Sequence, residues 1–221
     1  MAYAQDLTLI NDVQIAASRL GVASRWSSGT PVQVEDDFLF EMHLLFRVLT
    51  ALEANYSVTY VPGTGSTTHE FPKKPASKAG KPRFNVKDKN NGSRCFQICA
   101  GTTARDESGR PRGLDLSIQD ANAPDDPDYQ HVLQIFDAKY RKNSNDRITH
   151  AEFAAFAHWV ETFGLRNTPS AGLNLGTLND LDANCLVTNG RHSTETDNEC
   201  QRVTIKEIAR FYPNVNHQSR P

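Results

Sequence analysis

Three charged residues of this chain, Asp115, Asp137 and Lys139, stand in stretches where apolar residues recur at strand spacing. The string around Asp137 reads Leu-Gln-Ile-Phe-Asp-Ala-Lys-Tyr-Arg, so on a strand Asp137 and Lys139 project from the same face. In residues 113–118, Asp115 alternates in the same way with apolar side chains. A hairpin joining the two strands would set the two carboxylates opposite each other. Because like charges repel, such a pair is a natural site for a hard divalent cation.

A third acid, Glu41, lies on a helix that we expect from about Asp36 to Ala54. At helical spacing Glu41 shares a face with apolar residues such as Phe38 and Leu45, so it interrupts the apolar stripe. A lone glutamate is unfavourable there unless it meets a cation or a lysine. We therefore expect Glu41 to join the two aspartates.

The spacing from Asp115 to Asp137-x-Lys139 resembles the x-D…(D/E)-x-K signature of the PD-(D/E)XK nuclease superfamily. The string Phe-Asp-Ala-Lys-Tyr-Arg, which ends at Arg141, is similar to the catalytic strand of prokaryotic defence and restriction-type nucleases. The likeness is strong over about 105–142 and extends weakly through the following helix and strands. The residue before Asp115 is leucine, where the family signature has proline.

The resemblance implies that Asp115, Asp137 and the carbonyl of Ala138 hold Mg²⁺, with Mn²⁺ as an alternative. It also implies that Glu41 binds the metal through water or holds a second ion. Lys139 would orient or help deprotonate the attacking water and stabilise the transition state. The implied activity is hydrolysis of phosphodiester bonds in DNA, in a microbial defence or DNA-processing system. The alternatives are an RNA substrate, a catalytically weak nucleic-acid-binding or assembly module, and an ordinary salt bridge on an edge strand.

Basic residues are concentrated between Pro62 and Arg112, where eleven Lys and Arg residues stand against four Asp and Glu, although the whole chain carries −2. Such a segment suits a surface that faces a polyanion, and a solvated lysine-rich loop is the alternative. The residues expected to contact nucleic acid are Lys73, Lys74, Lys78, Lys81, Arg83, Arg112 and Arg141.

The elements that must position these groups follow from hydrophobic periodicity. It predicts helices over residues 6–20, about 36–54 and, after the capping box Thr149–Glu152, from 149 to about 164. Strands are predicted over residues 56–61, 84–87, 94–100, 114–118, 132–140, 185–188 and 203–211. This order predicts an α/β fold with a central mixed β-sheet flanked by helices, and the resemblance implies a restriction-endonuclease-like core.

We expect an N-terminal helix and linker at 1–35 and the nuclease-like domain at 36–221, with an exposed basic loop inserted at about 62–83. The four cysteines form no CxxC motif, which predicts free thiols. Neither a secretory signal nor an apolar run of membrane length is visible. We therefore expect a cytoplasmic, DNA-binding protein without membrane contact, with a homodimer or a larger complex as open possibilities.

Overall fold

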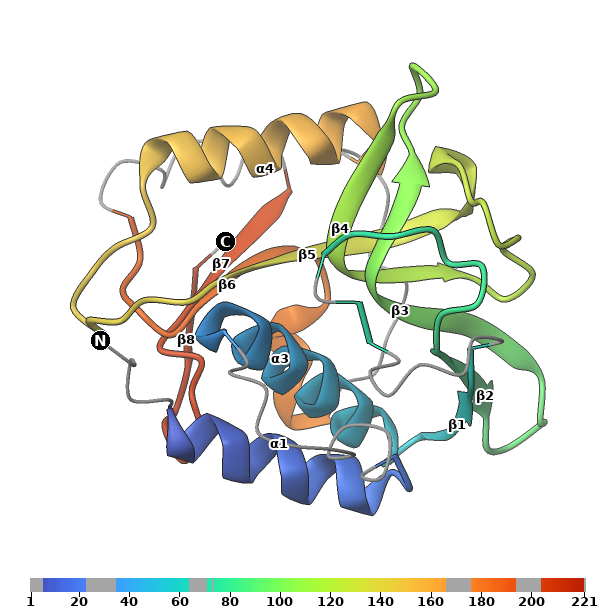
Figure 1. Ribbon diagram of the computed structural model, residues 1–221, viewed down its shortest axis with the longest axis horizontal. Coiled ribbons are helices and arrows are strands. Elements are labelled where there is room, and N and C mark those ends of the chain that lie inside the picture. Colours follow the sequence, from blue (N-terminus) through green and yellow to red (C-terminus); the bar gives the residue numbers. More distant parts are fainter. Residues whose placement is uncertain are drawn as a thin grey trace.

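A single mixed sheet of eight strands, ordered as in the sequence, forms the centre of the fold (Figure 1). The computed structural model describes residues 6–22, 35–63, 71–72, 74–165, 176–193 and 204–220. The strands are β1 (Tyr56–Val61), β2 (Arg83–Asp88), β3 (Arg94–Arg105), β4 (Pro111–Asp120), β5 (Val132–Lys139), β6 (Asn184–Thr188), β7 (Ile205–Ala209) and β8 (Gln218–Arg220).

The sheet has two halves that meet at β5. Strands β1 to β5 are antiparallel to their neighbours, β5 to β7 run parallel, and β8 is antiparallel to β7. The parallel half requires crossover connections, and one of them carries helix α4 (His150–Thr162). Strand β5 is therefore a central strand with β4 on one side and β6 on the other, which excludes the edge-strand alternative for Asp137 and Lys139.

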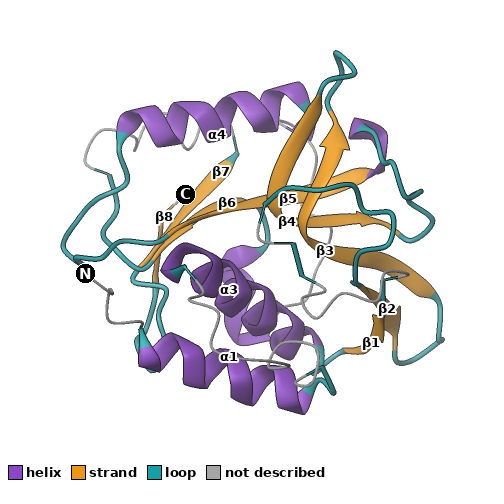
Figure 2. Cartoon of the chain, in the orientation of Figure 1, coloured by secondary structure: helices purple, strands orange, loops and turns teal. Residues whose placement is uncertain are grey.

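Helices cover both faces of the sheet (Figure 2). Helices α1 (Leu7–Arg19) and α3 (Asp36–Leu52) share one apolar core with the first face, and α4 packs in a second apolar core on the opposite face. Short 3-10 helices occupy Tyr129–His131 and Gly176–Leu181. The predicted α/β class with a mixed central sheet is confirmed.

Helix α1 belongs to the same core as the domain that follows it. Its buried residues Leu9, Val13 and Ala17 pack in one cluster with α3. The ring of His43 on α3 is 1% exposed and pairs with Asp12 at 2.7 Å between Nδ1 and Oδ2. A division at residue 35 therefore separates no independent core.

The helix termini follow the predicted chemistry. At the start of α4, Thr149 Oγ1 accepts from the Glu152 amide at 3.3 Å, and Glu152 Oε2 accepts from the Thr149 amide at 2.9 Å. Gly164, just beyond the end of α4, has φ +67°, a conformation that glycine adopts without strain. The predicted capping box and glycine stop of this helix are confirmed.

The prediction of an exposed loop over 62–83 is wrong for much of the part that the structure describes. Phe71 is 3% exposed and Lys78 is fully buried. The segment lies close against the sheet, because a Cβ on Gly113 would stand 2.2 Å from the ring of Pro75. The sequence contained no periodicity here because the segment packs irregularly rather than as a helix or strand.

Two further differences concern the strands. Strands β3 and β4 extend beyond their predicted ends, and the short polar strand β8 was not predicted.

Cys95, Cys99 and Cys185 are free thiols, as expected, and Cys200 lies outside the described residues. Within the described ranges, no helix combines the length and apolar character that a membrane span requires.

Candidate active site

The hairpin of β4 and β5 brings Asp115 and Asp137 together. Leu116 pairs with Phe136 in the antiparallel register, so the next position outward sets Asp115 opposite Asp137. Side chains at directly opposed positions have Cβ atoms about 4.5–5.5 Å apart. Asp137 is 5% exposed, and Asp115 Oδ2 accepts a 2.9 Å hydrogen bond from the amide of Ala138. The two carboxylates therefore lie side by side at the end of a buried strand.

Lys139 supplies the cation of this group. Its Nζ donates to Asp137 Oδ1 at 2.8 Å, and its side chain is 29% exposed, compared with 7% for Asp137. Burial alone would lower the pKa of Lys139, but the charge and hydrogen bond of Asp137 and the charges of Asp115 and Glu152 raise it. The ammonium thus stands between the acids and solvent, where an incoming anion can reach it.

Glu41 approaches the pair from α3 and is partly buried. Burial and the Asp137 charge raise the pKa of Glu41 to about 7, although the Lys139 charge opposes this shift. Burial, then the charges of Asp137 and Glu41, raise the pKa of Asp115 well above its usual range. We call Glu41, Asp115, Asp137 and Lys139 the acid cluster. It holds three carboxyl groups and one ammonium, so negative charge is incompletely compensated.

The donor chemistry of the acid cluster fits Mg²⁺. Asp115, Asp137 and the carbonyl of Ala138 provide oxygen ligands only, and the raised pKa values show where a divalent cation would relieve repulsion. Among the residues that the structure describes, no three His, Cys, Asp or Glu side chains converge on one point. Mg²⁺ commonly binds through one or two carboxylates and keeps water in its other positions. The residues present suit that mode, with Glu41 acting through water.

Arg141, two positions after Lys139, is engaged in contacts within the protein. It forms an ion pair with Glu152 on α4, and its side chain is 18% exposed. Its amide donates to Asn189 Oδ1 at 2.6 Å, and Asn189 Nδ2 donates to the Arg141 carbonyl at 2.9 Å. Burial raises the pKa of Glu152, but bonds from Arg141 and Thr149 outweigh it and lower that pKa. Arg141 therefore fixes α4 beside the acid cluster.

Three of the other six predicted nucleic-acid contacts, Lys78, Arg83 and Arg112, are also engaged within the protein. Lys78 Nζ donates to Gln97 Oε1 at 3.2 Å, to Gln119 Oε1 at 3.0 Å and to the Ala123 carbonyl at 3.0 Å. Because it is buried, Lys78 cannot contact a phosphate in this conformation.

The remaining predicted contacts differ in exposure. Arg112 Nε donates to Asp106 Oδ2 at 2.8 Å, and Arg83 lies 3.7 Å from Asp125. Lys74 is exposed and Lys81 partly exposed, whereas Lys73 lies outside the described residues. The surface that the structure leaves for a polyanion in this segment is therefore much smaller than the sequence indicated.

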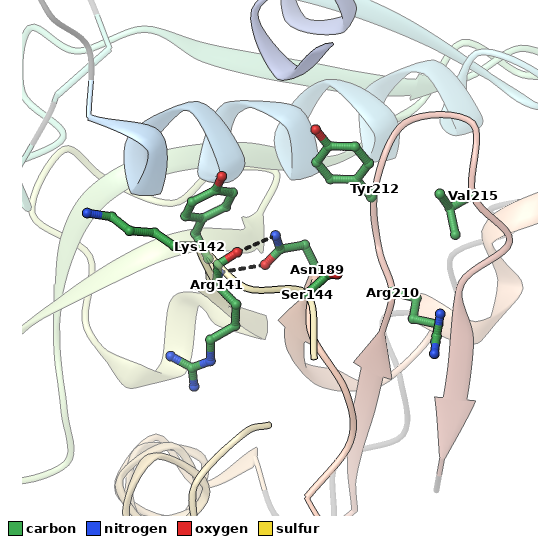
Figure 3. Close-up of a pocket in the computed structure, with 8 residues that line it drawn as sticks. Arg141, Lys142, Ser144, Asn189, Arg210, Tyr212 and Val215 are labelled. Atoms are coloured by element: carbon green, nitrogen blue, oxygen red, sulfur yellow. Dashed lines mark hydrogen bonds between the residues drawn. The ribbon is translucent and has the colours of Figure 1, made fainter. Parts of the chain in front are cut away.

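A second feature beside the acid cluster was not predicted. A pocket of about 320 Å³ lies at the carboxyl ends of β5, β6 and β7, and Tyr140, Asn189, Arg210 and Tyr212 contribute to its lining (Figure 3). Ligands of open α/β sheets commonly bind beyond the carboxyl ends of parallel strands. That rule could have identified the pocket, had the parallel pairing of β5 to β7 been predicted.

No protein-family model, curated protein or solved structure matches the chain. What the site can do chemically must therefore be inferred from its own geometry. The acid cluster can bind a cation through carboxylates and present an ammonium to an anion at the same place. That combination suits hydrolysis at a phosphoryl centre better than acyl transfer, because the cluster contains no serine, threonine or cysteine to accept an acyl group.

Proposed function

We propose that the protein is a Mg²⁺-dependent nuclease that hydrolyses phosphodiester bonds in DNA, within a microbial defence or DNA-processing system. The observation that carries the proposal is the pairing of Asp115 with Asp137 across β4 and β5, with Lys139 bound to Asp137 at 2.8 Å. The same three residues carry the likeness to the PD-(D/E)XK signature. The proposal includes a restriction-endonuclease-like core, for which the mixed sheet with helices on both faces provides support.

Each residue of the acid cluster has a role in this proposal. Asp115, Asp137 and the Ala138 carbonyl would hold Mg²⁺, or Mn²⁺ in its place. When bound, the metal supplies charge neutralisation at the phosphate and a more acidic water. Lys139 would donate to a non-bridging oxygen of the phosphate, and its bond to Asp137 keeps the ammonium in position. Glu41 would orient the attacking water by accepting a hydrogen bond from it.

A second candidate function is a nuclease-like domain kept for nucleic-acid binding or assembly, with little turnover. One observation favours it: no three acidic or imidazole ligands converge within the described ranges. Both candidate functions involve binding of nucleic acid. We propose DNA rather than RNA because the catalytic strand resembles that of restriction-type nucleases. Cleavage assays separate the two candidates.

The experiment is cleavage of plasmid DNA and of RNA with Mg²⁺, Mn²⁺ or EDTA. We expect the wild type to cut DNA with either metal and not with EDTA, and Asp137→Ala or Lys139→Ala to lower the rate at least about 100-fold. Matched controls are Asp126→Ala, whose side chain is 64% exposed, and Lys87→Ala, an exposed residue of β2. A wild type inert with every metal and substrate, or variants as active as the wild type, would overturn the proposal. DNA binding without cleavage would support the second candidate.

A further inference from the structure

The pocket at the carboxyl ends of β5, β6 and β7 adjoins the acid cluster through the chain itself. Tyr140, which lines the pocket, follows Lys139 directly. A molecule in the pocket can therefore continue toward the phosphate-binding position of Lys139 over one residue. The two features are separate in their chemistry, because no aspartate or glutamate is among the described residues that line the pocket.

The pocket is held in shape by backbone contacts. Two hydrogen bonds join Asn189 to the Arg141 backbone, as the dashed lines in Figure 3 show. The amide of Arg210 donates to the Gly190 carbonyl at 2.9 Å. A Cβ on Gly190 would stand 2.3 Å from the Asp146 carbonyl, so the loops after β5 and β6 approach as closely as glycine allows. Such a pocket is present before a ligand arrives.

Arg210 is a cation of the pocket lining that a ligand can reach. Arg210 is exposed, and its guanidinium has no ion pair or hydrogen bond within the part of the chain that the structure describes. Arg141, in contrast, is paired with Glu152. Arg210 also has φ +54°, an uncommon conformation for a non-glycine residue, and strained residues of this kind cluster at functional sites. An anion would meet Arg210 without displacing a partner among the described residues.

Two tyrosine rings also line the pocket. The hydroxyl of Tyr140 donates to Asp6 Oδ2 at 3.2 Å, and that of Tyr212 to Asp6 Oδ1 and Oδ2 at 2.7 and 2.8 Å. Burial and the nearby Asp6 raise the pKa of Tyr212 to about 12. Figure 3 shows the Tyr212 ring in the upper part of the view and Arg210 at the lower right. With their hydroxyl groups bound to Asp6, the rings are fixed and can offer only their faces or edges to a ligand.

We propose that this pocket binds one unpaired nucleotide of the DNA strand next to the phosphodiester at the acid cluster, an assignment that rests on the function proposed above. The base would lie against Tyr212 and Tyr140, and its phosphate would contact Arg210. Proteins that bind single strands combine a basic groove with aromatic rings, because every base has a face for stacking. A paired base is already stacked and enclosed by its partner strand, so the pocket selects for an unpaired end, flap or gap.

The test measures binding of the full chain to a fluorescein-labelled twelve-residue oligo-deoxythymidine strand and to a blunt duplex, by anisotropy in EDTA. Arg210→Asn removes the charge, and asparagine tolerates a positive φ. We expect it to weaken single-strand binding about fivefold. The magnitude of the slope of the logarithm of the binding constant against the logarithm of the salt concentration should decrease by about one, the change expected for the loss of one phosphate contact. Tyr212→Leu should weaken it by roughly tenfold or more. The effect on the blunt duplex should be smaller for both variants.

Two further variants separate this explanation from a general loss of structure. Tyr212→Phe keeps the ring but loses the bonds to Asp6, and we expect it to bind like the wild type. Arg19→Gln removes an arginine that is 61% exposed on α1, and it should have no effect. If Tyr212→Phe weakens binding as much as Tyr212→Leu, the Asp6 bonds matter and the stacking proposal fails.

The outcomes distinguish this proposal from the proposed nuclease function. A wild type that does not bind the single strand, or pocket variants that bind it unchanged, overturns the pocket assignment even if plasmid is cut. Equal losses on duplex and single strand also overturn it. Pocket-dependent binding by a protein that never cuts supports the pocket and rejects the nuclease activity.

Discussion

Asp106 and Asp115 stand nine positions apart in the same β3–β4 hairpin, and their surroundings are opposite in character. At the turn, Asp106 accepts from the Ser108 amide at 3.0 Å, the Ser108 hydroxyl at 2.6 Å, the Arg110 amide at 3.0 Å and Arg112 Nε at 2.8 Å. These bonds, that of the Ser108 side chain above all, hold the pKa of Asp106 well below its usual range although burial opposes them.

Asp115 accepts a hydrogen bond from the Ala138 amide and faces two other acids. Its charged form is therefore disfavoured where that of Asp106 is stabilised. The aspartate of the hairpin turn thus stabilises the fold, whereas the aspartates of the acid cluster are electrostatically unfavourable in their charged form. Ionisable groups whose charged form is destabilised by the surrounding protein are typical of functional sites.

The largest effect should come from exchanging charge for a neutral amide at Asp115. Asp115→Asn removes a ligand and we expect the Mg²⁺-dependent cleavage rate to fall about 1,000-fold, while the melting temperature in EDTA stays equal or rises because repulsion is relieved. Asp106→Asn, the matched control, should retain activity per folded molecule. Single-turnover cleavage and thermal melts check this pair, and a strong loss of stability in Asp115→Asn would contradict the contrast.

Asp106→Ala should have the opposite signature. It removes several charge-assisted hydrogen bonds and leaves Arg112 without its carboxylate, so we expect about 3 kcal/mol lower free energy of unfolding. For a chain of this size the melting temperature should fall by roughly 6–12 °C. Ser108→Ala, which loses only one donor, should lose about 1 kcal/mol. A drop no larger than that of Ser108→Ala would show that Asp106 is not the anchor of the turn.

The pH dependence of stability in EDTA offers a third comparison. The pKa of Glu41 is raised from 4.5 to about 7, so the folded state binds more protons than the unfolded state between these values. Stability from Glu41 is then full below about pH 4.5 and is lost as pH rises through about 7, a loss of about 3 kcal/mol. Asp115, whose pKa is also raised, acts in the same direction.

Denaturant unfolding in EDTA at pH 5 and pH 7.5 checks this expectation. Glu41→Gln should reduce the difference, and Mg²⁺ should stabilise the protein more at pH 7.5 than at pH 5. The turn at Asp106 should not contribute, because its lowered pKa acts only in strong acid. Stability that increases from pH 5 to pH 7.5 in EDTA would count against an under-compensated acid cluster.

The smallest effect should come from Arg112→Lys. Lysine keeps the charge but not the directed bond from Nε to Asp106, so we expect about 1 kcal/mol lower stability and unchanged binding to DNA. Equilibrium unfolding and anisotropy with the labelled strand measure both quantities. Weaker DNA binding without loss of stability would instead restore Arg112 to the nucleic-acid contacts that the sequence predicted.

The sequence could predict the acid cluster because its information is local. Strand alternation sets Asp137 and Lys139 on one face, and the alternating stretch around Asp115 indicates the neighbouring strand. A helical period was enough to mark Glu41 as an acid on an apolar face. These patterns also predicted most helices and strands to within a few residues.

The remaining features depend on contacts between distant segments. Lys78 looked like a surface cation because its partners Gln97 and Gln119 carry no periodic signal and lie far along the chain. The pocket required knowing that β5, β6 and β7 pair in parallel, and strand β8 consists of three polar residues that pair with β7. Pairing of this kind is decided by the whole sheet rather than by a window of sequence.

The bond from Tyr212 to Asp6 joins residues 206 positions apart. Ribosomes add about 5–20 residues each second, so Tyr212 is made on the order of ten seconds or more after Asp6. Contacts of such separation also form late in folding. A nascent chain that stops before Tyr212 therefore carries the acid cluster but lacks one of the two tyrosine rings bound to Asp6.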